Sequence, residues 1–297
     1  MPKTHPLAEV FGFPIENTSQ KAQRYRRLKL CPYNNKVPSC TKDKAQAPLG
    51  VCSVFENEAL AITCPIRFRE EWHVAEDAAS FFFPEGTKWT SLTEIRLNDR
   101  NGKSAGNIDL VLVSYDNNDK IIDFGALEIQ AVYISGNVRR PFEHYMDDYA
   151  NITDFDWTQE VNYPRPDYLS SSRKRLLPQL IYKGGILNNW RKKTAVALHE
   201  GFYDTLPQLP AVPMNEADIA WLIYSLDFDS ANSIYKLKKK RVVFTRFTDA
   251  LARVSNPEPG EICDFIEILQ TKLDQKLDEL TPPDAPTLQD IVNPNGG

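Results

Sequence analysis

The chain has 297 residues, of which 42% are hydrophobic and 25% charged, and its formal net charge is −5 at pH 7. This composition is typical of an ordinary globular protein, and the length allows one large domain or one domain plus a small module. No apolar run is long enough to span a membrane, and the N-terminal sequence MPKTHPLAEVFGF lacks the apolar core of a signal peptide. We therefore expect a cytoplasmic protein without a membrane partner.

Four cysteines cluster near the N-terminus: Cys31, Cys40, Cys52 and Cys64. In an intracellular protein such a cluster indicates metal binding before it indicates disulfides, although four unrelated reduced thiols would give the same pattern. Proline follows Cys31 and Cys64, so both lie in turn-forming sequence where thiolates can converge. Four thiolates suit zinc or iron. The sequence therefore predicts a small N-terminal metal-binding module over residues 1–70 with these four cysteines as ligands, and Cys263 stands apart.

From about residue 71 the sequence becomes regular, and hydrophobic periodicity predicts helices and strands. The expected elements are a helix over 70–83, strands over 94–97, 108–115 and 120–134 with a bulge at Gly125, a basic helix over 171–190 broken at Gly184 and Gly185, strands over 194–199 and 240–247, and a helix over 259–280. Segment 215–226 fits either a strand or a helix. A second, larger domain would span 71–280, and the Pro- and Gly-rich tail 281–297 is expected to be disordered.

An apolar stripe follows the last expected helix at helical spacing, which favours core or dimer packing. Its members are Ile262, Phe265, Ile266, Leu269, Leu273, Leu277 and Leu280.

Basic residues concentrate in three runs, 21–44, 173–193 and 236–241, although the chain is net acidic. Each run alone could be a solvated face. Three of them together favour a basic cleft for nucleic acid.

Two acidic residues of neighbouring predicted strands, Asp109 and Glu128, are the main candidates for chemistry. If the hairpin turns about the Asn118–Asp119 bond, Asp109 faces Glu128 at roughly 5 Å between Cβ atoms. Side chains alternate along a strand, so Gln130 shares that face. Two adjacent carboxylates repel each other, and a magnesium ion is the natural compensation. So short a pattern also occurs in strands that carry no site.

Two further residues could complete the site. Glu94 lies on the preceding predicted strand and could supply another carboxylate. Gln130 is neutral and cannot act as a base, but its amide could orient an attacking water.

The stretch Phe124-Gly-Ala-Leu-Glu-Ile-Gln130, with Gly106-Asn-Ile-Asp109 upstream and the four cysteines in this order, resembles the NotI-type restriction endonucleases of the PD-(D/E)XK nuclease superfamily. The basic helix from Arg173 to Gly184 is also similar, and the resemblance covers roughly 25–200 in patches. It implies an α/β fold with a mixed central sheet flanked by helices. It also implies a type II restriction endonuclease, a homodimer that uses Mg²⁺ to hydrolyse double-stranded DNA at a palindromic site.

Carried over to this chain, the resemblance implies that Asp109 and Glu128 are metal-binding catalytic carboxylates and that Glu94 is a supporting acid. Gln130 would stand where most of the superfamily has a lysine. The four cysteines would bind a structural metal, which is iron in the NotI type. Residues that could contact DNA are Arg139, Arg140, Arg173 and Arg175. The chain is shorter than the NotI prototype, so its recognition sequence can differ.

Two other functions remain open from the sequence. One is a DNA repair or homing nuclease of the same fold, and the other is a non-catalytic DNA-binding protein that uses the cysteine module. The histidines are scattered and are expected to be structural or superficial, with His144 near enough to the site region to stay open. They are His5, His73, His144 and His199. No glycine-rich phosphate loop is present in the sequence, which argues against nucleotide hydrolysis.

Overall fold

The computed structural model describes residues 5–44, 47–57, 59–149, 155–256 and 259–278. The chain divides into two compact units, residues 1–255 and residues 256–297. The predicted disorder of 281–297 concerns residues outside the described ranges, as does Leu280. Within those ranges, no helix is long and apolar enough to cross a membrane.

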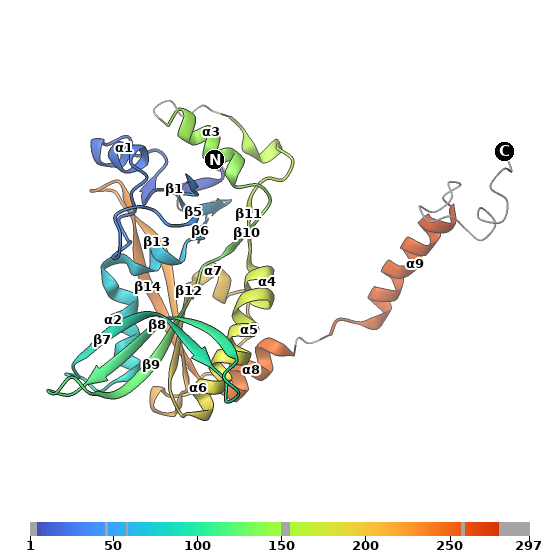
Figure 1. Cartoon of the computed structure of the whole chain (residues 1–297). Helices are drawn as coiled ribbons and strands as arrows, with labels where there is room; N and C mark the ends of the chain where they lie inside the picture. Colours follow the sequence, from blue (N-terminus) through green and yellow to red (C-terminus); the bar gives the residue numbers. More distant parts are fainter. Residues whose placement is uncertain (1–4, 45–46, 58, 150–154, 257–258, 279–297) are drawn as a thin grey trace. The chain divides into compact units, whose positions relative to one another are not determined.

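A six-stranded mixed sheet forms the centre of the first unit, with strand order β14-β13-β12-β9-β8-β7 (Figure 1). β12 runs parallel to both of its neighbours, and the other pairs are antiparallel. The strands are β7 (Trp89–Asn98), β8 (Ser104–Tyr115), β9 (Ile121–Gln130), β12 (Thr194–His199), β13 (Ile219–Asp229) and β14 (Ile234–Thr245). The predicted α/β fold with a mixed central sheet and helices is confirmed.

The adjacent strands β12 and β13 read as nearly continuous apolar runs because both of their faces are covered. All six residues of β12 are buried, as are the first six of β13. Segment 215–226, which fitted either element, therefore contributes to a strand, preceded by a short 3₁₀ turn at Met214–Glu216.

Helices cover both faces of this sheet. α2 (His73–Phe82) packs on one face against β8, β9, β12 and β13. The opposite face carries a helical segment over residues 168–189, here called the covering helix, together with α8 (Phe247–Ser255) (Figure 1). Within the covering helix the pieces are α4 (Tyr168–Ser171), η3 (Ser172–Leu176), α5 (Leu177–Gln179), η4 (Leu180–Gly184) and α6 (Gly185–Asn189).

The covering helix contains two wide π turns. It continues through Gly184 and Gly185, so the break predicted at these glycines is wrong. The N–H of Leu177 bonds to the Ser172 carbonyl, and that of Gly185 bonds to the Leu180 carbonyl. Pro178 has no N–H to give the carbonyl four residues earlier, which favours wider turns at this point. Gly184 serves packing instead, because a Cβ there would lie 2.8 Å from the Phe247 ring.

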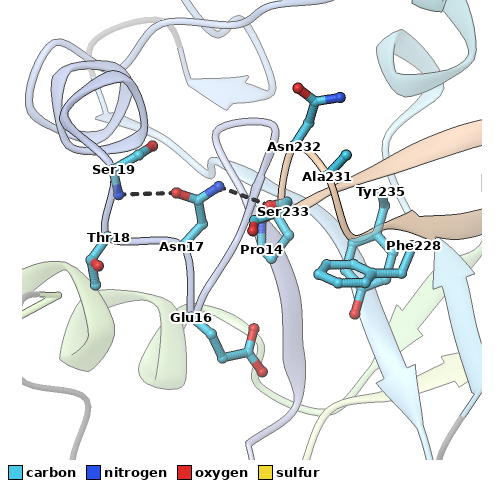
Figure 2. Close-up of a pocket in the computed structure, with 10 residues that line it drawn as sticks. All are labelled: Pro14, Glu16, Asn17, Thr18, Ser19, Phe228, Ala231, Asn232, Ser233 and Tyr235. Carbon is cyan, nitrogen blue, oxygen red and sulfur yellow. Dashed lines mark hydrogen bonds between the residues drawn. The ribbon is translucent and has the colours of Figure 1, made fainter.

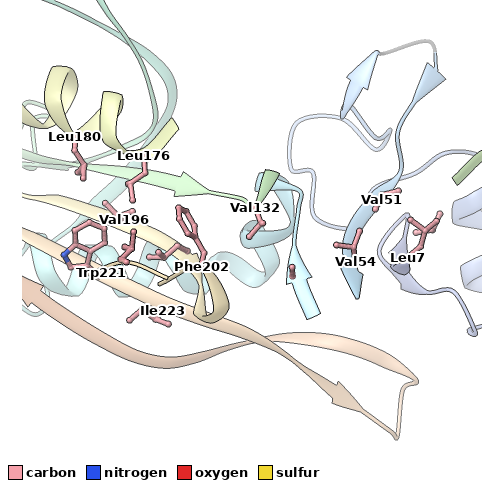
Figure 3. Close-up of a cluster of buried hydrophobic side chains, with 14 of the residues drawn as sticks. Leu7, Val51, Val54, Val132, Leu176, Leu180, Val196, Phe202, Trp221 and Ile223 are labelled. Atoms are coloured by element: carbon pink, nitrogen blue, oxygen red, sulfur yellow. The ribbon is translucent and has the colours of Figure 1, made fainter. Parts of the chain in front are cut away.

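A second, four-stranded sheet with the order β2-β1-β5-β6 lies in the N-terminal part. Its strands are β1 (Leu7–Val10), β2 (Phe13–Pro14), β5 (Val51–Glu56) and β6 (Ala59–Ile62). One buried apolar cluster runs from this sheet to the face of the central sheet that carries the covering helix. It extends from Leu7 and Val54 through Val132 to Val196 and Trp221 (Figure 3). The two sheets therefore share a core.

A buried ion pair also joins the N-terminal sheet to the central sheet. The Arg67 guanidinium donates to the Glu9 carboxylate at 3.1 Å and to the Tyr235 carbonyl of β14 at 2.8 Å. Both charged side chains are fully buried, so each depends on the other for compensation. A surface pocket beside this junction shows a second tie, because Asn17 donates to the Ser233 carbonyl at 2.8 Å (Figure 2).

The remaining elements are short or peripheral. They are α1 (Gln20–Arg27), β3 (Asp43–Lys44), β4 (Ala47–Pro48), η1 (Pro65–Trp72), β10 (Tyr133–Ser135), α3 (Arg139–Asp147), η2 (Trp157–Gln159), β11 (Arg165–Asp167) and α7 (Glu200–Tyr203). The second unit contains α9 (Ile262–Asp278), as predicted, and its apolar stripe from Ile262 to Leu277 is exposed. Packing of that stripe stays a prediction.

Gly125 does not form the predicted bulge, since it pairs in register with Leu112. A Cβ at Gly125 would lie 2.4 Å from the Phe82 ring of α2. The glycine therefore lets α2 approach β9 closely.

We expect Gly125→Ala to lower the free energy of unfolding by about 1–3 kcal/mol, the usual cost of overpacking a core. Urea unfolding measures this change. Gly185→Ala is the matched control, because its Cβ would meet nothing within 4 Å and alanine favours a helix. Equal stability of the two variants would contradict the packing role of Gly125.

Candidate active site

The predicted register of the β8–β9 hairpin is confirmed. Leu110 pairs with Leu127 and the same register continues to Ser114 and Asp123. Asp109 and Glu128 are therefore the next opposed positions on these strands. They lie on the sheet face that the covering helix packs against, since Val111 and Ala126 of the same face contact Leu187.

Asp109 lies beyond the last regular pair of the hairpin and is held by the partner strand. Its Oδ2 accepts a hydrogen bond of 2.8 Å from the Ile129 N–H. Burial raises the pKa of the Asp109 carboxyl above its usual value, while that hydrogen bond and the Lys183 ammonium act in the opposite direction. The carboxylate is thus fixed in place but poorly solvated.

Glu128 is almost fully buried, with 4% of its surface exposed. Its Oε2 accepts a hydrogen bond of 2.6 Å from the Lys183 ammonium, whereas Oε1 is buried without a hydrogen-bond partner among the described residues. Burial raises the pKa of Glu128 to about 8, with the Asp109 charge adding to the rise and Lys183 opposing it. A buried oxygen without a donor is costly unless a cation or donor reaches it.

Glu94 stands opposite Asp109 on the other side of β8. Its neighbours Thr93 and Ile95 pair with Leu110 and Ile108, which places the Glu94 position across from Asp109. The Glu94 charge is one of the influences that raise the Asp109 pKa. Glu94 is exposed and has a positive φ of 56°, so its side chain leaves the regular strand pattern. Three acids therefore occupy one row across β7, β8 and β9.

Gln130 is buried and contacts the covering helix. Its side-chain amide donates to Oε1 of Gln179. The predicted position on the Glu128 face is consistent with this contact, because Gln179 and Lys183 reach the two β9 side chains from the same helix.

Lys183 was not predicted as a site residue. Its ammonium donates to the Asn107 carbonyl at 2.8 Å as well as to Glu128. A lysine between apolar residues and a glycine pair, in IYKGG, is the one sequence signal that could have singled it out. Arg69 of η1 is a second cation that acts electrostatically on Asp109, and its Nε is buried without a hydrogen-bond partner in the described part of the chain.

The donor set fits a hard divalent cation. Two carboxylates lie side by side, and one buried oxygen, Glu128 Oε1, has no partner in the described ranges. Among the described residues, however, no group of three or more His, Cys, Asp or Glu side chains is close enough to hold a metal ion. Glu94 is therefore a neighbour of the pair and not a third ligand in this arrangement.

The four cysteines line one small cavity with Phe11, Tyr33 and Arg67. All four are free thiols, and burial raises the pKa of Cys31 to about 11 and that of Cys52 well above its usual value. In the described ranges, the cysteines form no group of three or more side chains that could hold a metal ion. The side-chain positions therefore do not support the predicted metal module. Protonated thiols are poor metal ligands, because the thiolate is the form that binds a metal.

Much of the predicted basic surface is engaged within the protein. Arg26 of the first run is fully buried and donates to the Asn17 and Pro14 carbonyls. All five basic residues of the third run form ion pairs, with Asp229, Asp227, Asp77 and Asp204. Most of that run is therefore locally neutralised, and it is a weaker candidate for a DNA contact than the sequence suggested.

The four arginines proposed to contact DNA differ in whether their side chains already form ion pairs. Arg139 pairs with Asp43, and Arg140 pairs with Glu160. Arg175 lies over the exposed Tyr133 ring, 5.3 Å from its centre, just beyond the end of β9. Arg173 is exposed on the covering helix.

The histidine left open by the sequence belongs to an aromatic cluster. His144 packs edge-on against Trp157 at 5.2 Å between ring centres and also contacts Phe155. His199 caps α7 by accepting from the Gly201 N–H. These contacts are structural.

A sequence model of the family described as "Restriction endonuclease NotI" matches residues 9–237, which is most of the chain and includes all the site residues above. A comparison with curated proteins finds no match.

We expect Asp109→Asn to raise the free energy of unfolding in EDTA at pH 8 by about 1 kcal/mol, the scale typical of relieving a strained site. The raised pKa of Asp109 means that its ionisation weakens the folded state as pH rises from the ordinary value of 3.8 through the folded-state value. Asparagine keeps the acceptor for Ile129 without the charge. The gain should therefore shrink at pH 4.

Urea unfolding at the two pH values measures this difference. Asp119→Asn in the exposed hairpin turn is the control and should show no such pH-dependent gain. A destabilised Asp109→Asn at pH 8 would contradict a cost of burying the ionised Asp109 carboxylate.

Proposed function

Because the chain belongs to the family of restriction endonuclease NotI, we propose that it is a type II restriction endonuclease that hydrolyses double-stranded DNA at a palindromic site with Mg²⁺. Family membership implies a DNA-cleaving enzyme. The observation that carries the finer proposal is the pair Asp109–Glu128, in which the buried Glu128 Oε1 has no partner among the described residues. We place the site in the PD-(D/E)XK class as part of this proposal, and the activity in the cytoplasm.

In the proposed site, Asp109 and Glu128 would hold the magnesium ion. When bound, the ion supplies positive charge that polarises the scissile phosphodiester and makes a coordinated water more acidic. The Ile129 N–H keeps Asp109 facing Glu128. Glu94 adds negative charge at the exposed edge of the row, and Gln130 stays neutral, so its role would be hydrogen bonding and not proton abstraction.

A homodimer is the proposed assembly, since a two-fold symmetric protein reads a palindrome with one active site for each strand. Arg173 and Arg175 are the proposed DNA contacts with the freest side chains, because Arg139 and Arg140 already form ion pairs. Phosphate contacts of this kind make binding strongly dependent on salt.

A structural iron or zinc ion at the four cysteines is also part of the proposal. The support is that all four are free thiols and line one buried cavity. Burial raises the pKa values of Cys31 and Cys52, so a bound cation would be needed to stabilise their thiolates near neutral pH. Such an ion would draw the sulfurs together, and would fix the start of η1, which follows Cys64 directly.

We expect the purified protein to cut a long DNA of known sequence into discrete fragments in Mg²⁺ buffer and not in EDTA. Glu128→Ala should lower the cleavage rate by at least about 100-fold, since it removes a proposed metal ligand. Glu76→Ala, an exposed acid on the opposite sheet face, is the control and should cut normally. Gel analysis of the fragments gives the rates and the cut positions.

The other outcomes separate the alternative functions. A smear of fragments would favour a nonspecific or repair nuclease. Magnesium-independent binding without cleavage, on several DNAs, would overturn the nuclease proposal in favour of a DNA-binding protein.

For the cysteines, we expect elemental analysis to find about one equivalent of iron or zinc in the protein, and less than about a tenth of that in Cys52→Ser. Cys263→Ser is the matched control, because Cys263 is exposed and lies outside the cluster. It should keep the metal. A metal-free, stable wild-type protein would show that the four thiols are only packed together.

A further inference from the structure

Two side chains of the covering helix reach the two functional side chains of β9. Lys183 donates to Glu128 Oε2 at 2.6 Å, and Gln179 accepts from the Gln130 amide. The order of the pairs is reversed, with the earlier helix residue meeting the later strand residue. The helix therefore runs antiparallel to β9 over the site.

The spacing of the four residues explains why both contacts form together. Four residues of a helix rise about 6 Å, and two residues of a strand rise about 6.6 Å. Gln179 and Lys183 are four apart, while Glu128 and Gln130 are two apart. The helix thus contacts alternate, same-facing positions of the strand without a shift in register.

Lys183 is the buried lysine of the described chain, with 4% of its surface exposed. An ammonium in that position is costly unless it is fully paired. Its partners are Glu128 on β9 and the carbonyl of Asn107 on β8, two residues before Asp109. The lysine therefore links the two strands that carry the carboxylates.

We propose that Lys183 and Gln179 are positioning residues of the active site, and that Lys183 holds Glu128 by Oε2 so that Oε1 remains directed to a metal ion. The inference rests on the proposed function. It places the positive charge of the site on the covering helix, while the strand position two after Glu128 is the neutral Gln130.

Two constraints make this arrangement rigid. The Ser171 hydroxyl at the start of the covering helix accepts from the Tyr133 N–H at 2.8 Å, which ties the helix to the chain just after β9. The Phe247 ring of α8 packs on Gly184, next to Lys183. Both ends of the contact are therefore fixed by packing that does not involve the carboxylates.

The test compares Lys183→Met, Lys183→Arg and Lys174→Met. Binding of Mn²⁺ to the DNA-free protein is measured by calorimetry, and single-turnover cleavage is measured in Mg²⁺. Lys183→Met should weaken Mn²⁺ binding by about 10- to 100-fold, the usual effect of losing a group that orients a metal ligand. It should lower the cleavage rate at saturating DNA more than the affinity for DNA, whereas Lys183→Arg should recover part of both.

Lys174→Met is the matched control, because Lys174 is exposed on the same helix. Its Mn²⁺ affinity should equal that of the wild type. A Lys183→Met protein that binds Mn²⁺ and cleaves like the wild type would overturn the inference. If Glu128→Ala binds Mn²⁺ as tightly as the wild type, the proposed metal site itself is overturned. The two failures are therefore distinguishable.

Gln179→Leu keeps the inference testable if Lys183→Met does not fold. Gln179 is only partly buried, so its loss is less disruptive. We expect this variant to bind Mn²⁺ normally and to cleave more slowly at saturating DNA, since it frees Gln130 and not Glu128. Unchanged cleavage would remove Gln179 from the proposal.

Discussion

The burial of two carboxylates at opposed positions of β8 and β9 is the constraint on which the site depends. The hairpin register places Asp109 beside Glu128, in a setting where Glu128 is buried under the covering helix and Asp109 is half-buried. Burial raises the pKa of each carboxyl, to about 8 for Glu128. Folding with both groups ionised therefore costs free energy, which is consistent with the proposed cation site. Around this pair the described chain places partial compensation only: one backbone N–H, one lysine and the nearby Arg69.

The cysteine region is joined to this site through a short stretch of chain. η1 begins directly after Cys64 and carries both Arg67 and Arg69. Arg67 is paired with Glu9 and bonded to β14, so the backbone of η1 is fixed at that residue. Two residues later, Arg69 acts on Asp109. A metal at the cysteines would thus stabilise a segment that contributes charge to the active site.

The sequence was sufficient to predict the strand pair because its turn is encoded locally by Asp116 to Asp119, and one register follows from that turn. The family was predicted from short motifs around Asp109, Glu128 and the four cysteines, which are also local features of the sequence. Contacts between distant segments were missed. Lys183 meets Glu128 across 55 residues, and the IYKGG stretch around the lysine does not identify that distant partner. The predicted bulge at Gly125 was wrong. A glycine is needed there because the Phe82 ring, which lies on another element, packs against it. The basic surface predicted from charge was wrong at Arg26 and weakened in the third basic run for a similar reason. The hydrogen-bond and ion-pair partners of these residues are set by the fold.

The lysine-rich strand β14 has a consequence apart from DNA. It is an edge strand of the central sheet, and edge strands can pair with the edge of another molecule. Part of this edge is already covered within the chain, because the Leu237 N–H donates to Glu70 and the Tyr235 carbonyl accepts from Arg67. Lys236, Lys238, Lys239 and Lys240 are exposed along it, held over the strand by acids of β13 and α2. Approach of a second copy along this edge would have to displace these ion pairs and strip water from the lysine ammonium groups. The lysine run therefore disfavours pairing between the edges of folded copies, and we expect replacement of these lysines to lower the solubility of the protein.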